Sequence, residues 1–118
     1  MSCLREIAFF KAKDVLETNC PNISRSESVS KVVSLLTSSE SYEAIVINSE
    51  LNGVVTVRDT LKVLNPERTS VARILFKPPS MGSDTPLYDV ASALISNRIR
   101  IIPIVDNGSI SGVVRQKA

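Results

Sequence analysis

The sequence contains two copies of one pattern, and this internal repeat restricts the possible folds more than any other feature. The copies align at an offset of 58 residues, which rises to 59 after one extra residue in the second copy. The aligned segments are 21–24 with 79–82, 29–36 with 87–94, and 53–55 with 112–114. We therefore expect two similar structural units related by a pseudo-twofold axis.

The first copy predicts a leading strand, a helix, two strands and a closing helix. The first helix begins after Ser28, because apolar residues follow at spacings of three and four, as in a half-buried helix. Continuous apolar strands are predicted at 44–47 and from Gly53 onward. Asn52-Gly53 is the strongest signal for the turn between these strands, and the closing helix is predicted at 58–64.

The second copy repeats this order. Thr85-Pro86 predicts a helix start with proline in the first turn, and Asn107-Gly108 predicts the turn between two strands. Those strands are expected at 101–105 and 110–114. Continuous apolar strands joined by helices predict an α/β (α+β) fold, in which each repeat packs a small sheet against two helices.

The composition excludes several classes of function. The net charge is only +2 and no block of Lys or Arg occurs, which argues against a nucleic-acid partner. Histidine is absent, and Cys3 and Cys20 lack a second pair, so we expect reduced thiols, no catalytic residues, no metal site and no required cofactor. No apolar run approaches the roughly 20 residues of a membrane span, and the N-terminus is a poor signal peptide; a cytoplasmic, membrane-free protein is predicted.

A hydroxyl and a carboxylate follow the strand that begins at Gly53. Thr56 and Asp59 are three residues apart, so at the start of a helix they project to nearly the same side. The carboxylate suits the paired hydroxyls of a ribose, whereas the threonine hydroxyl and free helix amides suit a phosphate oxygen. The local sequence alone favours a different interpretation, in which the two residues only cap the helix.

The order and spacing of these elements resemble the cystathionine-beta-synthase (CBS) domain, and two in tandem resemble a Bateman module. The resemblance rests on the apolar-Pro-apolar-Val-Asp strand at 102–106 and the Gly-apolar-apolar-Thr-x-x-Asp segment at 53–59. It extends from Ala12 to the C-terminus. Parts of the second half (76–78, 87–90 and 98–106) are also similar to the gamma subunit of AMP-activated protein kinase.

The resemblance gives expected boundaries for the parts of the chain. Residues 1–11 are an N-terminal segment expected to be helical, 12–67 the first repeat and 68–118 the second. The chain ends where the last helix of the second repeat would begin. Two interpretations stay open: the missing helix leaves a face for a partner, or the sequence is a fragment of a longer protein.

The resemblance also implies a ligand site. In this family two clefts lie between the repeats and commonly hold adenosine-containing ligands. The ribose aspartate of the family falls on Asp59, its hydroxyl on Thr56, and a basic phosphate contact of the kinase subunit on Arg100. The opposite wall is expected from the other repeat. The predicted nucleotide-binding residues are Thr56, Arg58, Asp59, Ser80, Met81, Gly82, Arg100, Ile101, Ile102 and Pro103.

The second cleft departs from the family pattern. Arg115 replaces the expected serine or threonine, and Ala118 replaces the ribose aspartate. This site is expected to be empty, weak or filled by Arg115 itself, although Arg115 and Lys117 would attract a polyphosphate. The residues of this weak second site are Ile23, Ser24, Ala44, Ile45, Arg115 and Lys117.

The expected function is that of a nonenzymatic regulatory module that senses AMP, ADP or ATP. The charge of Arg58 and Arg100 fits these nucleotides better than S-adenosylmethionine, which remains an alternative ligand. A structural dimerisation module with degenerate sites, or a subunit that contributes a surface to an enzyme, is also consistent with the sequence. The expected partners are a second copy of the chain, packed through its helices, and a regulated protein.

Overall fold

The computed structural model describes residues 9–116, apart from the side chain of Asn52. The chain divides into two compact units. One unit is Cys20–Lys77, and the other combines the residues up to Asn19 with those from Pro78 onward. Most of the predicted N-terminal helix, together with Cys3, Lys117 and Ala118, lies outside the described residues.

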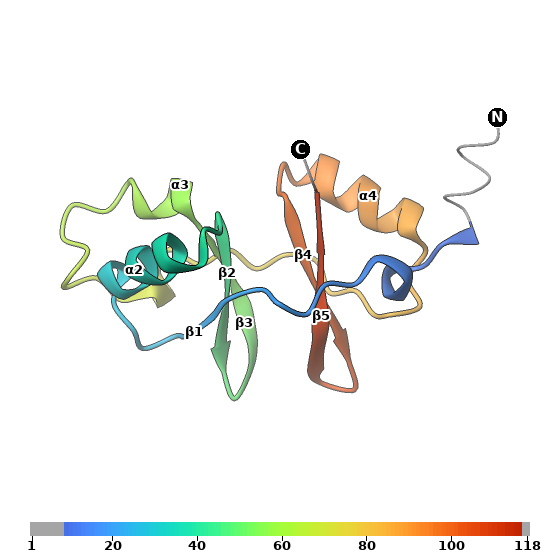
Figure 1. Ribbon diagram of the computed structural model, residues 1–118, viewed down its shortest axis with the longest axis horizontal. Helices are drawn as coiled ribbons and strands as arrows, with labels where there is room; N and C mark the ends of the chain where they lie inside the picture. Colours follow the sequence, from blue (N-terminus) through green and yellow to red (C-terminus); the bar gives the residue numbers. More distant parts are fainter. Residues whose placement is uncertain (1–8, 117–118) are drawn as a thin grey trace. The chain divides into compact units, whose positions relative to one another are not determined.

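The Cys20–Lys77 unit contains a three-stranded sheet with helices beside it (Figure 1). The strand order is β1-β2-β3, with β1 parallel and β3 antiparallel to β2. In chain order the elements are β1 (Asn22–Ser24), α2 (Val29–Ser39), β2 (Glu43–Asn48), β3 (Glu50–Thr56), α3 (Val57–Thr60) and the 3-10 helix η2 (Val71–Arg73).

Helix α2 has a defined start and end. The hydroxyl oxygen of Ser28 accepts a hydrogen bond from the backbone N–H of Lys31 at 3.2 Å, which caps the N-terminus. Glu40, with φ 51°, adopts the left-handed conformation that ends the helix. The apolar face between these ends carries Val32 and Leu36, which lie one turn apart.

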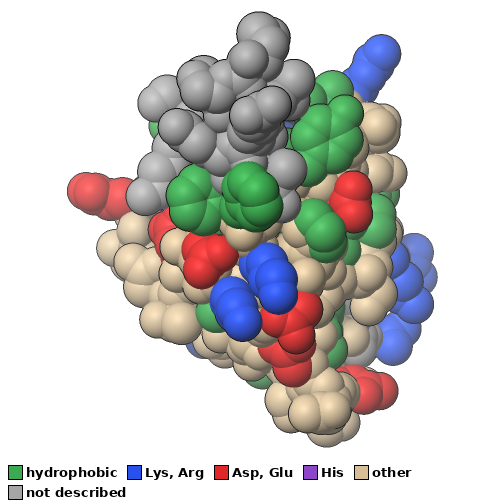
Figure 2. All heavy atoms as spheres, turned by 90° about the vertical axis from the view of Figure 1, so that its right-hand side faces the viewer, with side chains coloured by type: hydrophobic (Ala, Val, Ile, Leu, Met, Phe, Trp, Pro, Cys, Tyr) green, Lys and Arg blue, Asp and Glu red, His purple; other side chains and the backbone are tan. Residues whose placement is uncertain are grey.

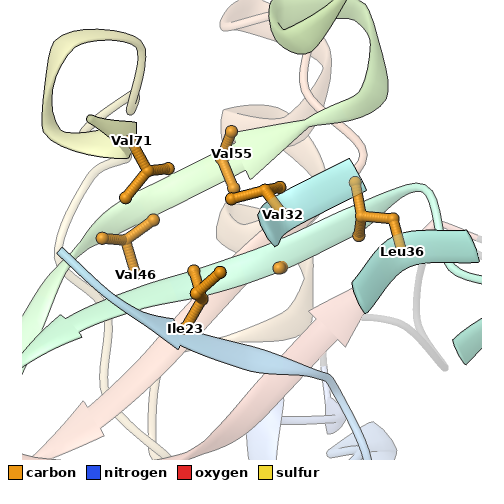
Figure 3. Packing of buried hydrophobic residues seen from close by; sticks show 7 residues of the cluster. Ile23, Val32, Leu36, Val46, Val55 and Val71 are labelled. Carbon is orange, nitrogen blue, oxygen red and sulfur yellow. The ribbon is translucent and has the colours of Figure 1, made fainter. Parts of the chain in front are cut away.

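The core of this unit packs that apolar face against all three strands. Val32 and Leu36 of α2 meet side chains of the sheet, and Figure 3 shows them together with Val71 of η2. Burial of each such side chain contributes about 1.5–3 kcal/mol. The buried members of the cluster are Ile23, Val32, Leu36, Ala44, Val46, Val55 and Val71.

The other unit is built around a two-stranded antiparallel hairpin. Its elements are the 3-10 helix η1 (Ala12–Val15), α4 (Leu87–Ser96), β4 (Ile101–Asp106) and β5 (Ser109–Arg115). The predicted turn is confirmed: Asn107 and Gly108 both have positive φ, 51° and 80°, as a tight hairpin requires. The buried core contains Ala12, Val90, Leu94, Ile102, Ile104 and Val114.

Each unit also contains the segment that precedes the other copy of the repeat. Val54 of β3 exchanges two backbone hydrogen bonds with Phe76, at 2.8 and 2.7 Å. Val113 of β5 exchanges two with Glu17, both at 2.8 Å. Glu17 and Phe76 bond to equivalent residues of the two copies, Val113 and Val54, so the two leading segments are exchanged between the copies.

Three local predictions were wrong. Asn52-Gly53 is not a turn, because β3 runs through it; the chain turns at Ser49, with φ 61°, and Gly53 pairs with Val46. The closing helix ends at Thr60, since beyond it the apolar side chain of Leu61 is 79% exposed and has little packing to stabilise further turns. Pro86 is the N-cap of α4 and not part of its first turn.

Candidate functional site

Thr56 and Asp59 bond to each other at the junction of β3 and α3. Oδ2 of Asp59 accepts hydrogen bonds from the backbone N–H and the hydroxyl of Thr56, at 3.2 and 2.9 Å. The backbone N–H of Asp59 donates to Oγ1 of Thr56 at 3.3 Å. This reciprocal arrangement is a capping box, so the helix-cap interpretation describes the local geometry.

The capping box leaves the Asp59 carboxylate with further acceptor capacity. Both side chains are half-buried, and the three bonds involve only one of the two carboxylate oxygens. An ionised carboxylate has about four acceptor positions. Arg58, the residue between them on α3, is exposed. The structure thus brings the predicted hydroxyl and carboxylate together and presents an arginine on the same short helix.

The other predicted residues belong to the second unit, where Ser80, Met81 and Gly82 form a loop next to β4. The carbonyl of Met81 accepts a hydrogen bond from the N–H of Val105 at 2.8 Å, and Met81 forms an isolated parallel bridge with Ile104. The N–H of Gly82 donates to Oγ1 of Thr85 at 3.1 Å. This loop is therefore held close to the strand without becoming part of the sheet.

Asp106 holds the next residue of the loop, an interaction that the sequence analysis missed. Its Oδ1 accepts from the N–H of Ser83 at 3.0 Å, and its Oδ2 accepts from the hydroxyls of Ser83 and Ser111. These hydrogen bonds, first that from Ser111, lower the pKa of Asp106 to about 2. We call Asp106, Ser83 and Ser111 the Asp106 cluster. Asp106 is the last residue of the apolar-Pro-apolar-Val-Asp motif at 102–106, and this motif is the one feature of the sequence that indicated Asp106.

The predicted residues on β4, and Arg100 directly before it, differ in what they can offer a ligand. Arg100 is exposed, and its carbonyl accepts from the N–H of Gln116 at 2.7 Å. Ile101, Ile102 and Pro103 are buried, and Ile102 belongs to the core of its unit. A ligand at this strand would therefore contact backbone groups of Ile102 and not its side chain.

The residues predicted for the weak second site are also divided into buried apolar residues and more exposed polar ones. Ile23 and Ala44 are core residues of the Cys20–Lys77 unit, and Ile45 is buried as well. Ser24 is exposed and its hydroxyl lies 3.0 Å from that of Ser26. Arg115 is half-buried at the end of β5. Lys117, the last residue of the predicted set, is outside the described part of the chain.

Three charged residues form two ion pairs in the unit that contains α4. Asp84 forms ion pairs with Lys13, at 3.2 Å, and Lys11, at 3.6 Å. The hydrogen bond from Lys13, together with the positive charges of both lysines, lowers the pKa of Asp84. Figure 2 shows basic and acidic side chains next to one another on one face. All three residues are well exposed, so the pairs are worth little free energy and are screened by salt.

An apolar groove lies between α2 and α3, on the Cys20–Lys77 unit. Its volume is about 310 Å³, and its lining includes Val33, Tyr42, Val57 and Leu61. Val33, Tyr42 and Leu61 are 43, 63 and 79% exposed. None of the predicted nucleotide-binding residues lines this groove.

Residues 9–116 contain neither a metal-binding cluster nor a membrane-spanning helix. Within this range no group of three or more His, Cys, Asp and Glu residues is arranged to hold a metal ion. The helices that the structure describes are all too short or too polar to cross a membrane.

Comparisons with solved structures agree with this architecture. The CBS domain of a bacterial CNNM/CorC family Mg2+ transporter, solved in complex with ATP, superposes with a TM-score of 0.87 at 15% identity, over 97% of this chain and 87% of that one. A CBS domain-containing protein from Thermotoga maritima gives 0.75 at 21% identity, over 90% and 88%. Comparison of the sequence with curated proteins finds no significant match.

Two units of one α+β pattern, each with a small sheet and accompanying helices, define the class of a tandem-repeat module. The sequence profile of the CBS domain matches residues 12–66 and 71–118. The chain belongs to the CBS-domain family and carries two repeats. Pairs of CBS domains are regulatory modules that bind ligands, and the resemblance seen in the sequence is confirmed at this level.

Proposed function

We propose that this chain is a regulatory module that binds an adenine nucleotide, AMP, ADP or ATP. The proposed ligand residues are Thr56, Arg58 and Asp59 in the first repeat, and Ser80–Gly82 with Arg100–Pro103 in the second. The observation that carries the proposal is the Thr56–Asp59 pair, which presents a carboxylate at the strand exit. The ATP complex of a bacterial relative supports the ligand class.

Each part of the proposed site has a chemical role. The Asp59 carboxylate accepts hydrogen bonds from the ribose hydroxyls, which keeps the sugar in one orientation. The Arg100 and Arg58 guanidinium groups bind the phosphates, where a planar fork of donors matches two phosphate oxygens. The residues predicted for a second site lack a carboxylate at residue 118 and have Arg115 at the hydroxyl position, so we propose at most weak binding by them.

The proposal leaves open how many phosphates the preferred ligand carries. The resemblance to the kinase gamma subunit that we infer from the sequence of the second half favours AMP, whereas the complex of the transporter relative favours ATP. S-adenosylmethionine has no phosphate for Arg58 and Arg100 to bind. Competition among the four ligands in one titration series therefore identifies the ligand.

The test is calorimetric titration of the chain with AMP, ADP, ATP and S-adenosylmethionine. We expect one nucleotide per chain, and a loss of affinity of roughly ten- to a hundredfold in Asp59→Ala. Asp89→Ala is the matched control, because Asp89 is an exposed acid in the first turn of α4 and outside the proposed site. Equal affinity of both variants, or no binding of any of the four by the wild type, would contradict the proposal.

A second proposal concerns assembly: the groove between α2 and α3 is where two copies of the chain pair. The exposed apolar side chains of Tyr42 and Leu61 next to a groove support it, since such surfaces in soluble proteins mark contacts. Pairing at this groove would couple nucleotide binding to dimer formation, because α3 borders the groove and carries Asp59.

A further inference from the structure

We propose that Asp106 is a positioning residue of the nucleotide site, which fixes the loop Ser80–Ser83 in the shape that the ligand requires. This inference rests on the proposed function, since the loop contains Ser80, Met81 and Gly82 of the proposed nucleotide-binding residues. It adds a residue that contacts no ligand and acts through the loop.

The contacts of the Asp106 cluster show how the loop is held. The carbonyl of Met81 accepts from Val105, and the backbone N–H of Ser83 donates to Asp106, so residues two apart in the loop are attached to consecutive residues of β4. A Cβ atom on Gly82, between them, would lie 3.2 Å from Oδ1 of Asp106. The carboxylate therefore sits directly against the loop backbone, and the hydroxyl of Ser111 on β5 also donates to it.

The first copy of the repeat fixes its loop in a different way. There β1 forms a regular parallel ladder with β2, pairing Asn22, Ile23 and Ser24 with successive residues. In the second copy this ladder is reduced to the single bridge between Met81 and Ile104. The hydrogen bonds of the Asp106 cluster replace the missing ladder, so the loop is fixed while its peptide groups around Ser80 stay outside the sheet.

The carboxylate of Asp106 is present only in the copy whose loop belongs to the proposed nucleotide site. The positions equivalent to Ser83, Asp106 and Ser111 are Arg25, Asn48 and Asn52, so the first copy has no carboxylate there. Its loop carries Ile23 and Ser24 of the weak second site, for which the sequence has Arg115 and Ala118 in place of the expected ligand residues. The carboxylate thus occurs in the copy whose loop carries proposed nucleotide-binding residues, and the fold of the first copy forms without it.

The test compares nucleotide affinity with stability in the full chain. We expect Asp106→Ala to weaken binding of the preferred nucleotide about tenfold at a temperature where the variant is fully folded. Asp106→Asn should recover part of the loss, because the amide oxygen still accepts from the N–H of Ser83. Ser70→Ala is the matched control. It removes a hydroxyl of the Cys20–Lys77 unit that donates to the carbonyl of Arg25 and caps η2.

A purely structural role predicts another result. In that case Asp106→Ala and Ser70→Ala both lower the melting temperature, and the dissociation constants of both stay at the wild-type value; this would overturn the inference alone. Absence of nucleotide binding by the wild type would overturn the proposed function and this inference with it. If Asp106→Ala does not fold, Ser111→Ala decides the question, because it removes a single hydrogen bond; we expect about a threefold loss of affinity, and an unchanged value would overturn the inference.

Discussion

Gly53 lies so close to Phe76 that no side chain fits between them. A Cβ atom at residue 53 would be 2.5 Å from the carbonyl oxygen of Phe76. Gly112, the equivalent residue of the other copy, has the same relation to Glu17, also at 2.5 Å. Both glycines thus allow a leading segment to bond to the strand that follows the hairpin turn, which is how the segments are exchanged between the copies.

Gly53→Ala should destabilise the chain by about 1–3 kcal/mol, because the neighbour that the new methyl group meets is backbone and must shift. The free energy of unfolding in urea measures the effect. Gly108→Asn is the control: its surroundings are open, and asparagine tolerates the φ of 80°. A loss in Gly53→Ala no larger than in the control would show that the Phe76 segment is not held as described.

Thr56→Ala should cost about 1 kcal/mol of stability, because it removes the hydroxyl of the capping box, whereas Thr56→Ser should retain most of it. If the same hydroxyl binds a phosphate, Thr56→Ala should also weaken nucleotide binding and Thr56→Ser should not. Thermal unfolding and titration of both variants separate the two roles. Equal stability of the alanine and serine variants would contradict the cap.

The sequence was sufficient to predict features that depend on short separations along the chain. The strands, the Asn107–Gly108 turn and the meeting of Thr56 with Asp59 follow from hydrophobic periodicity and from residues a few positions apart. The fold class is confirmed by the CBS profile and the structural relatives. The residue assignments of the nucleotide site stay predictions.

Features that depend on distant backbone contacts were not predictable in the same way. The bridge between Glu17 and Val113 is made by peptide groups, which every residue carries, so no side-chain pattern announces it. Gly53 was assigned to a turn because glycine favours turns, although here its missing side chain makes room for Phe76. The Asp106 cluster joins residues from a loop and two strands, and its serines are common residues with no motif of their own.

Acid should remove the stabilisation that the Asp106 cluster provides. The pKa of Asp106 falls from an ordinary 3.8 to about 2 on folding, so the ionised form is favoured by the folded state. The resulting stability is complete above about pH 4 and is lost as the pH falls from 3.8 toward 2. Between pH 2 and 5 the free energy of unfolding should therefore change less with pH in Asp106→Asn than in the wild type.

Asp84 provides the comparison for this pH experiment. Its pKa is also lowered, chiefly by the hydrogen bond from Lys13, but the pair is exposed and screened by salt. Asp84→Asn should thus lose its effect on the pH profile in high salt, whereas the difference between Asp106→Asn and the wild type should persist. Identical profiles for Asp106→Asn and the wild type would show that the serine hydrogen bonds do not favour the ionised carboxylate.

Leu61→Asp should shift the chain from dimer to monomer, because it places a charge in the apolar groove where we propose that two copies meet. Light scattering after size-exclusion chromatography, over a range of protein concentrations, measures the mass of the particle. Leu64→Asp is the matched control: Leu64 is 95% exposed and lies three residues away, but it does not line the groove. A wild-type monomer at all concentrations, or equal dissociation by both variants, would exclude this groove as the contact. Loss of the dimer only in Leu61→Asp would link assembly to the helix that carries Asp59, since Leu61 directly follows α3.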